Sequence, residues 1–201
     1  MIKIEEGKDL YDYIDKYDII LVGTDIYCNM SQGFQRKVML NYPYVLDANM
    51  STRYADKSKL GSTIECKQDG KPTFVLLFIS EGNHRPDLKK DTLSYESLEK
   101  CIKLCNILYK GMNVACTFLG TSRFDGNGDK DRVLEILSTN SSKINLTVFD
   151  YEQLSRSEEL KKVRVAEIKL KEVDADAYYE AVKKRKAEAE ERFEKNKHAR
   201  Y

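Results

Sequence analysis

His84 is the side chain in this sequence best suited to chemistry on a phosphate ester. It lies in the polar segment 81–92 and is the only histidine before residue 152. An imidazole that titrates near neutral pH can act as a nucleophile or as a general acid. The guanidinium groups of Arg85 and Arg123 could bind phosphate through two parallel hydrogen bonds. An exposed loop histidine and two surface arginines are the simpler interpretation of the same residues.

Two polar turns could form a ligand site. Residues 24–33 follow the apolar run 19–22, and residues 120–128 follow the apolar run 113–119; each turn precedes a segment with helical periodicity. Open α/β sheets bind ligands where strands end, because N–H groups at helix starts point into the crevice. We therefore predict the main ligand pocket between these two turns. An ordinary connection from strand to helix explains the first turn equally well.

Polar side chains in the two turns also have structural explanations. Asp125 and Asp129 flank the second turn, where turn formation and capping of the following helix account for both carboxylates. Ser31 could bind a ribose hydroxyl, but we favour a role as the N-cap of the helix expected at residues 32–41. In that helix Phe34 and Val38 are expected to face inward and Gln35 to face solvent.

Composition restricts the class of protein. The 201 residues include 34 basic and 33 acidic side chains, a net charge of +1, so nothing in the overall charge indicates a nucleic-acid partner. The longest apolar run, residues 74–79, is too short to cross a bilayer, and the first residues lack the apolar core of a signal peptide. We expect a cytoplasmic protein without a membrane partner.

The five cysteines show no CxxC spacing, and the chain has two histidines. A structural metal site and a cofactor are therefore not expected. We interpret most of the cysteines as small core residues of a reduced protein. They are Cys28, Cys66, Cys101, Cys105 and Cys116.

The order of the elements predicts an α/β fold. Apolar runs at residues 19–22, 74–79, 113–119 and 144–150 are typical of buried strands, and residues 94–110 have the clearest helical periodicity. Asp69 and Gly70 indicate a hairpin between strands at residues 62–67 and 72–80. We expect a three-layer α/β/α sandwich with a mixed, mostly parallel sheet over residues 1–151.

Residues 152–201 differ in character and are expected to form a C-terminal extension. One alternating segment within residues 158–172 could be an extra edge strand, and residues 174–201 are expected to form a charged helix with one thin apolar stripe. A solvated helix is the simpler interpretation. A helix that binds a protein partner or a second copy of the chain is the alternative.

Taken together, these segments resemble a macro domain, the ADP-ribose-binding fold, and are most similar to small macro proteins that remove the terminal phosphate from ADP-ribose phosphate. The resemblance covers residues 1–151 and rests on the register of SQGFQRKVMLNYP, SYESLEKCI, DRVLEIL and INLTVFDY. It implies that Asp9 accepts the adenine amino group. Phe124 would cover a ribose or the diphosphate, and His84 would be catalytic.

The sequence also departs from the family pattern. Gly7-Lys8-Asp9-Leu10 has one residue more than the usual motif, and the first turn has Asp25 near the usual asparagine and keeps only Gly33 of the glycine run. A carboxylate is a poor neighbour for a diphosphate because like charges repel. The binding residues implied by the resemblance are Asp9, Thr24, Asp25, Asn29, Ser31, Gly33, Gly120, Ser122, Arg123, Phe124, Asp125, Gly126, Asn127 and Gly128.

Two functions stay open at this point. The first is binding of ADP-ribose or a related nucleotide derivative, with weak phosphatase or ADP-ribosyl hydrolase activity; Gly120, Gly126 and Gly128 favour it, since glycine lets backbone N–H groups approach phosphate. The second is a macro-like fold with a degenerate site that acts as an interaction or structural module through its C-terminal extension. Asp25 and the missing glycines favour the second.

Overall fold

A computed structural model describes residues 2–82, 92–122 and 126–151. All of them lie in the first of the two units into which the chain divides, Met1–Glu152 and Gln153–Tyr201. The edge strand and the charged helix expected after residue 152 fall outside the described residues, as do His84 and the rest of segment 83–91.

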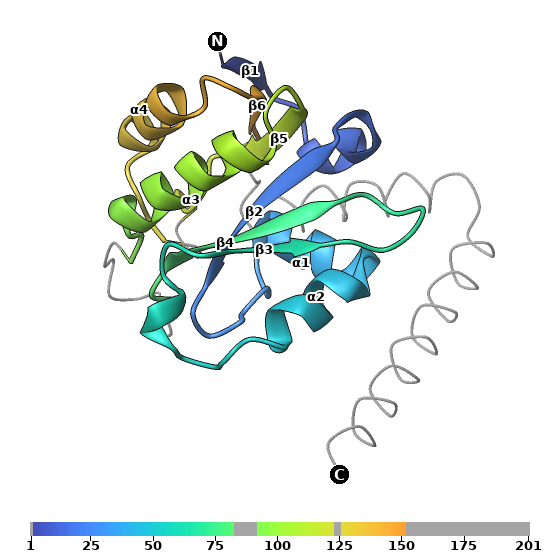
Figure 1. Ribbon diagram of the computed structural model, residues 1–201, viewed down its shortest axis with the longest axis vertical. Coiled ribbons are helices and arrows are strands. Elements are labelled where there is room, and N and C mark those ends of the chain that lie inside the picture. Colours follow the sequence, from blue (N-terminus) through green and yellow to red (C-terminus); the bar gives the residue numbers. More distant parts are fainter. Residues whose placement is uncertain (1, 83–91, 123–125, 152–201) are drawn as a thin grey trace, which may run out of the picture. The chain divides into compact units, whose positions relative to one another are not determined.

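The described strands form one sheet in the order β1-β6-β5-β2-β4-β3 (Figure 1). Every neighbouring pair is parallel except β3 and β4, which are antiparallel. The strand bounds are β1 Lys3–Glu6, β2 Ile19–Asp25, β3 Thr63–Cys66, β4 Phe74–Ser80, β5 Asn113–Thr117 and β6 Asn145–Asp150. The expected mixed, mostly parallel sheet is confirmed.

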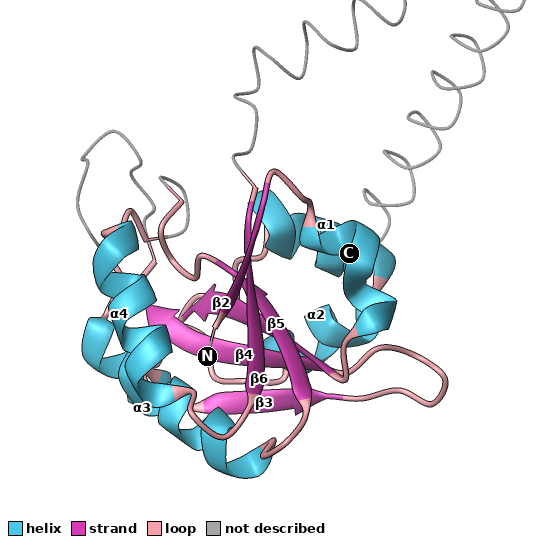
Figure 2. Ribbon diagram, turned by 90° about the horizontal axis from the view of Figure 1, so that it is seen from above, coloured by secondary structure: helices cyan, strands magenta, loops and turns pink. Residues whose placement is uncertain are grey.

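Helices cover both faces of this sheet. Figure 2 shows α3 and α4 on one side of the strands and α1 and α2 on the other. The α-helices are α1 Gly33–Asn41, α2 Pro43–Met50, α3 Tyr95–Leu108 and α4 Lys130–Asn140, and two short 3-10 helices are η1 Leu10–Lys16 and η2 Lys57–Lys59. The three-layer α/β/α arrangement expected from the sequence is therefore confirmed.

Two apolar cores explain the continuous apolar runs in the central strands. Along β2, Ile19 and Leu21 pack with α3 and α4, whereas Ile20 and Val22 pack with η1, α1 and α2. Successive side chains of a strand point to opposite faces, so a strand with both faces covered must be apolar throughout. The same argument applies to β4, in which every residue is buried.

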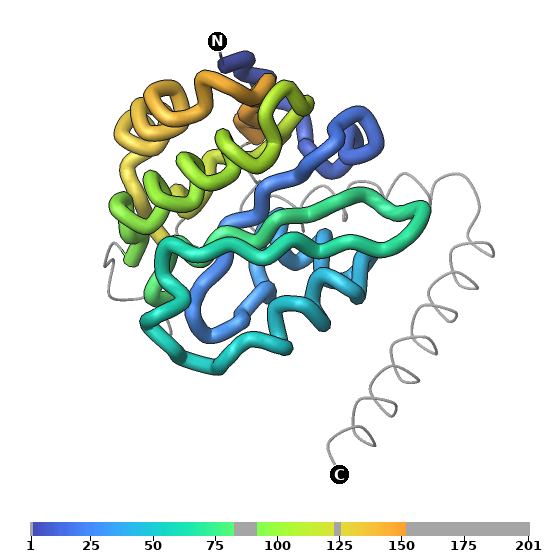
Figure 3. Tube along the Cα trace, viewed as in Figure 1, coloured from blue at the N-terminus to red at the C-terminus, as the bar shows by residue number. Residues whose placement is uncertain are grey.

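The predicted hairpin joins β3 to β4 and pairs Cys66 with Phe74. Gly70 in the turn between them has φ +69°, which a side chain rarely adopts, so glycine suits this position. β1, in contrast, pairs with β6, which is far away in the sequence (Figure 3).

Two expectations about α1 are wrong. Its N-cap is Gln32, without a side-chain hydrogen bond, rather than Ser31. The helix begins at Gly33, which leaves Ser31 one residue too early to cap it. Gln35 is buried with Val38, because residues three apart share one face of a helix.

Candidate functional site

The first turn and the second turn leave the sheet at the same edge. They follow β2 and β5, which are parallel neighbours with Ile19 paired to Val114 and Leu21 paired to Cys116. Turns that follow adjacent parallel strands must emerge side by side at the carboxyl ends of those strands. The geometric condition for a shared ligand site is met.

Asp25 organises the first turn from its own side chain. Its Oδ1 accepts the N–H of Tyr27 at 2.9 Å and the N–H of Asn29 at 3.1 Å. Asn29 Oδ1 in turn accepts the N–H of Ser31 at 3.1 Å. Thr24 is buried beneath the turn, within 3.3 Å of Asn49 Nδ2. Four predicted site residues, Thr24, Asp25, Asn29 and Ser31, therefore lie together. The side-chain oxygens of Asp25 and Asn29, however, accept hydrogen bonds from the backbone of the turn.

The second turn is closed by its own backbone. Gly126 N and Asn127 N donate to the carbonyl oxygen of Ser122 at 3.1 and 3.0 Å, and Gly128 N donates to that of Gly120 at 3.0 Å. The carbonyl of Gly126 accepts the N–H of Thr92 at 2.9 Å, which ties the turn to the segment before α3. These N–H groups already have partners inside the protein.

The three glycines of the second turn surround the buried side chain of Leu93. A Cβ built on Gly120 or Gly128 would lie 2.6 or 2.4 Å from a Leu93 methyl carbon. A Cβ on Gly126 would lie 2.5 Å from the carbonyl oxygen of Gly120. A Cβ at Gly126 would meet backbone, so packing requires glycine there, and a Cβ at Gly120 or Gly128 would force the buried Leu93 side chain to shift. The prediction that their N–H groups meet phosphate is not needed to explain them.

Asp9 has two partners. Its Oδ1 accepts the N–H of Tyr11 at 3.0 Å as the N-cap of η1, and its Oδ2 forms an ion pair with Lys37. Burial alone would lower the pKa of Lys37, but the hydrogen bond and the charge of Asp9 outweigh burial and raise it. Lys37 Nζ also lies 5.8 Å from the ring centroids of Tyr11 and Tyr151. The carboxylate that the resemblance assigns to adenine is thus held by a cation among tyrosines.

The remaining candidates divide into two groups. Asp129 caps α4, accepting the N–H of Arg132 at 2.8 Å, and this confirms the structural alternative for that residue. Gly33, with φ +53°, opens α1 at the end of the first turn. The others lie outside the described residues, and these are His84, Arg85, Arg123, Phe124 and Asp125.

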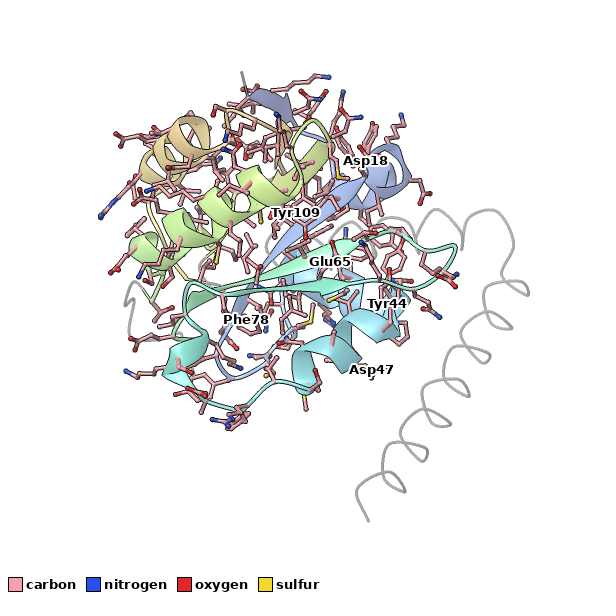
Figure 4. The ribbon with its side chains drawn as sticks, viewed as in Figure 1. Asp18, Tyr44, Asp47, Glu65, Phe78 and Tyr109 are labelled. Atoms are coloured by element: carbon pink, nitrogen blue, oxygen red, sulfur yellow. The ribbon has the colours of Figure 1, made fainter. Side chains whose placement is uncertain are left out.

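Sequence reasoning missed a polar cluster under the first turn. Lys59 Nζ donates to Cys28 Sγ at 3.3 Å and to Thr52 Oγ1 at 3.0 Å. Cys28 Sγ donates to the carbonyl oxygen of Asn49 at 3.2 Å. The same ammonium lies 4.7 Å from the ring centroid of Phe78, a β4 residue labelled in Figure 4. Lys59 stands in a charged segment, and nothing in that segment predicted its contact with Cys28.

Metal and membrane features are absent from the part of the chain that the structure describes. Residues 2–82, 92–122 and 126–151 contain no group of three or more His, Cys, Asp or Glu side chains placed to hold a metal ion. Within the same ranges, every helix is too short or too polar to span a bilayer.

The comparisons find similarity at the level of structure. No family model and no curated protein matches the sequence. Thermosipho africanus DarTG, solved in complex with ADP-ribose, matches with a TM-score of 0.59 and 14% identity over 78% of this chain and 44% of that chain. The macrodomain of Mycobacterium tuberculosis DarG matches with a TM-score of 0.56 and 14% identity, covering 76% of this chain and 99% of that chain.

A macrodomain protein from Streptomyces coelicolor is similar to the same extent, with a TM-score of 0.55 and 14% identity over 76% of this chain and 100% of that chain. These matches agree with the sheet order and with the helical layers on both of its faces.

Proposed function

The described part of the chain has the macrodomain fold, and from this premise we propose that it binds ADP-ribose or a related nucleotide derivative. The observation that carries the proposal is the position of the first and second turns, side by side at the carboxyl edge of β2 and β5. Thermosipho africanus DarTG, which shares the fold, was solved with ADP-ribose bound, and that protein supplies the ligand class for the test.

The surroundings of Asp9 suit the adenosine part of such a ligand. Gly7 N donates to the carbonyl oxygen of Asp150 at 2.9 Å, which holds the segment leading to Asp9 against the end of β6. Tyr151 follows directly and is exposed. Tyrosine rings beside a carboxylate can stack on a base while the carboxylate accepts an amino proton. Lys37 would have to release one oxygen of Asp9 for that contact.

The diphosphate would lie between the two turns. Asp25 opposes it by charge, so we expect binding that is weaker than an uncharged first turn would permit. A thermal-shift titration with ADP-ribose tests this. Ligand at 100 times its dissociation constant should stabilise the protein by about 2.7 kcal/mol. ADP and ribose 5-phosphate, tested alongside, separate recognition of the two halves of the ligand.

A matched pair of variants locates the binding. Asp25→Asn should bind ADP-ribose more tightly than the parent protein because it removes a negative charge beside the diphosphate. Asp69→Asn makes the same change in the β3–β4 turn, before β4 and therefore at the opposite edge of the sheet from the first turn, and should leave the affinity unchanged. Equal effects of both variants, or no stabilisation by any nucleotide, would remove the proposal.

We also propose that any phosphatase activity is weak and depends on His84. An imidazole can act as a nucleophile or a general acid on a phosphate monoester, and the other histidine is His198, far along the C-terminal extension. His84→Ala should abolish release of phosphate from ADP-ribose phosphate, while His198→Ala should retain the parent rate. A His84→Ala protein as fast as the parent excludes this role. ADP-ribosyl hydrolase activity can be assayed on the same proteins.

A second candidate function is an interaction module whose ligand site is degenerate. It is favoured by the N–H groups of Tyr27, Asn29, Gly126 and Gly128, all of which already have partners within the two turns. The proposed binding segment is then residues 174–201. Removing this segment should leave a cooperative melt and change the mass measured by sedimentation. An unchanged mass together with a clear ADP-ribose shift would favour the first function instead.

A further inference from the structure

The polar cluster under the first turn consists of Cys28, Asn49, Thr52 and Lys59, and it contains a thiol and an amine in direct contact. The Cys28 and Lys59 residues are 6% and 8% exposed, and Lys59 Nζ lies 3.3 Å from Cys28 Sγ. Cys28 has φ +57°, a conformation that few residues other than glycine adopt. The backbone of Cys28 thus lies in the left-handed region, and its sulfur contacts Lys59.

The contacts of Lys59 are unusual for a buried lysine. Nζ donates to Cys28 Sγ and Thr52 Oγ1 and lies over the Phe78 ring. Among the described residues, no carboxylate forms an ion pair with Nζ, and the charge of Asp56 acts on it from a longer distance. Lys59 Nζ is thus in direct contact with the sulfur, and a lysine nitrogen in its free amine form is a nucleophile.

The cluster has a further unsatisfied polar atom. Asn49 is 0% exposed; its Nδ2 lies 3.3 Å from Thr24 Oγ1, and its Oδ1 has no hydrogen-bond partner among the described residues. Buried polar atoms are nearly always paired, and an exception is expected where a site has a chemical role or takes up a small polar molecule.

The other four cysteines belong to the apolar cores, whereas Cys28 contacts Lys59 and the carbonyl oxygen of Asn49. Burial raises the pKa of Cys66 to about 11 and that of Cys101 and Cys105 to about 12, and burial raises the pKa of Cys116 as well. A thiol kept protonated in apolar surroundings reacts slowly with oxidants. Within the described residues, Cys28 is the thiol that an ammonium group contacts.

We propose that Cys28 and Lys59 are joined by a covalent cross-link when the protein meets a peroxide. Peroxide first transfers one oxygen to sulfur, so that the thiol and H2O2 become a sulfenic acid and water. The neutral Lys59 amine then attacks the sulfur. An S–N bond forms, the S–O bond breaks, and the hydroxide leaves with the amine proton as a second water. Sulfur is oxidised and peroxide is reduced.

The cross-link would tie the first turn to η2. It would close a loop between residues 28 and 59, which restricts the unfolded chain and raises the melting temperature in the way a disulfide does. The proposal does not depend on nucleotide binding, because every residue it uses lies in the cluster itself. A thiol reductant attacks the sulfur of an S–N bond and would restore both side chains.

The test is treatment of the full-length folded protein with hydrogen peroxide, followed by trypsin digestion without reductant. We expect peptides 17–36 and 58–67 to be joined, lighter by two hydrogen atoms than their sum, with Lys59 uncut. Dithiothreitol should separate them and reverse the rise in melting temperature. A joined pair that keeps one oxygen, an N–O–S bridge made with a second peroxide, links the same side chains and equally supports the proposal.

Three variants make the result specific. Lys59→Arg keeps the charge but has no amine nucleophile and should not cross-link, whereas Lys57→Arg, in the same short helix, should cross-link as the parent does. Cys66→Ala should also retain the link, which excludes a disulfide between the same two peptides. Lys59→Met serves if Lys59→Arg does not fold. Recovery of free Lys59 with Cys28 unmodified or as a sulfinic acid in the parent would overturn the proposal.

Discussion

The first turn and the second turn follow neighbouring parallel strands, but different forces hold them. In the first turn, the side chains of Asp25 and Asn29 accept the N–H groups of Tyr27, Asn29 and Ser31. In the second turn, backbone carbonyls accept the N–H groups, and three glycines make room for Leu93. The first turn depends on the carboxylate of Asp25, and the second turn depends on glycines that leave space for the Leu93 side chain.

This difference bears on how each turn can meet a ligand. The carboxylate of Asp25 accepts hydrogen bonds from N–H groups that a bound phosphate would otherwise accept. An anionic ligand therefore has to compete with Asp25 for them. In the described part of the second turn, neutral backbone carbonyls accept the N–H groups, so an anionic ligand would compete there with carbonyl oxygens rather than with a carboxylate. The following variants test how far the two turns differ.

The largest effect on stability is expected from a rise in pH, because the apolar cores on the two faces of the sheet contain different cysteines. Cys101 and Cys105 lie on the α3–α4 face, and their pKa is raised from an ordinary 9.0 to about 12. Such thiols stabilise the fold fully below about pH 9, and the stability is lost as the pH rises towards 12. The two thiols together contribute a loss on the order of 1 kcal/mol or more per pH unit in that window.

Urea unfolding between about pH 8 and about pH 11 measures this loss. Cys105→Ala should show a shallower fall in stability with pH than the parent protein. Val133→Ala, a cavity on the same face with no titrating group, should lower stability equally at every pH. Parallel curves for Cys105→Ala and the parent would refute this account.

The next largest effect is expected at Gly120. Gly120→Ala should lower the free energy of unfolding by about 2–5 kcal/mol, from a φ of +70° and from the contact with buried Leu93. Gly70→Ala is the matched control, since Gly70 has φ +69° and open space around it, and should cost about 1–2 kcal/mol. If both variants lose the same amount of stability, the contact with Leu93 does not explain why position 120 is a glycine.

Asp25 provides the corresponding test of the first turn. Asp25→Ala leaves two N–H groups without their acceptor and should lower the free energy of unfolding, measured by chemical denaturation, by about 1–2 kcal/mol. Asp25→Asn keeps an acceptor oxygen and should cost less. High salt should reduce the difference between the parent and Asp25→Asn, because part of it is the charge. A stable Asp25→Ala protein would show that the turn does not need its carboxylate.

The smallest effect is expected at the helix starts. Asp129 caps α4, so Asp129→Ala should cost about 1 kcal/mol. Ser31 does not cap α1, so Ser31→Ala should change stability by less than about 0.5 kcal/mol. Thermal melts of both variants, recorded under the same conditions, measure this difference in stability. A costly Ser31→Ala would mean that the serine acts through a contact other than the cap.

The fold was predictable where a pattern lies within one segment. The apolar runs of β2 and β4, the periodicity of α3, the Asp-Gly hairpin and the cap at Asp129 are all local signals, and the structure confirms them. The cap assigned to Ser31 failed by one residue, because the start of a helix is poorly defined by pattern alone.

The features that were missed join distant parts of the chain. Lys37 reaches Asp9, Lys59 reaches Cys28, and Leu93 packs against glycines 27 or more positions away. Each pair depends on how the sheet brings segments together, and no spacing in a single sequence encodes it. The catalytic prediction for His84 stays open, since the described residues do not include it.

The pairing of β1 with β6 has a consequence for synthesis of the protein. β1 is made before every other described strand, yet its partner is the last of them, with Lys3 opposite Thr147 and Glu6 opposite Asp150. At about 5–20 residues per second, a ribosome needs several seconds to travel from one to the other. A chain released before residue 145 would leave β1 without its partner and the edge of β5 open to other strands. Premature termination in this stretch should therefore yield aggregates rather than a smaller folded domain.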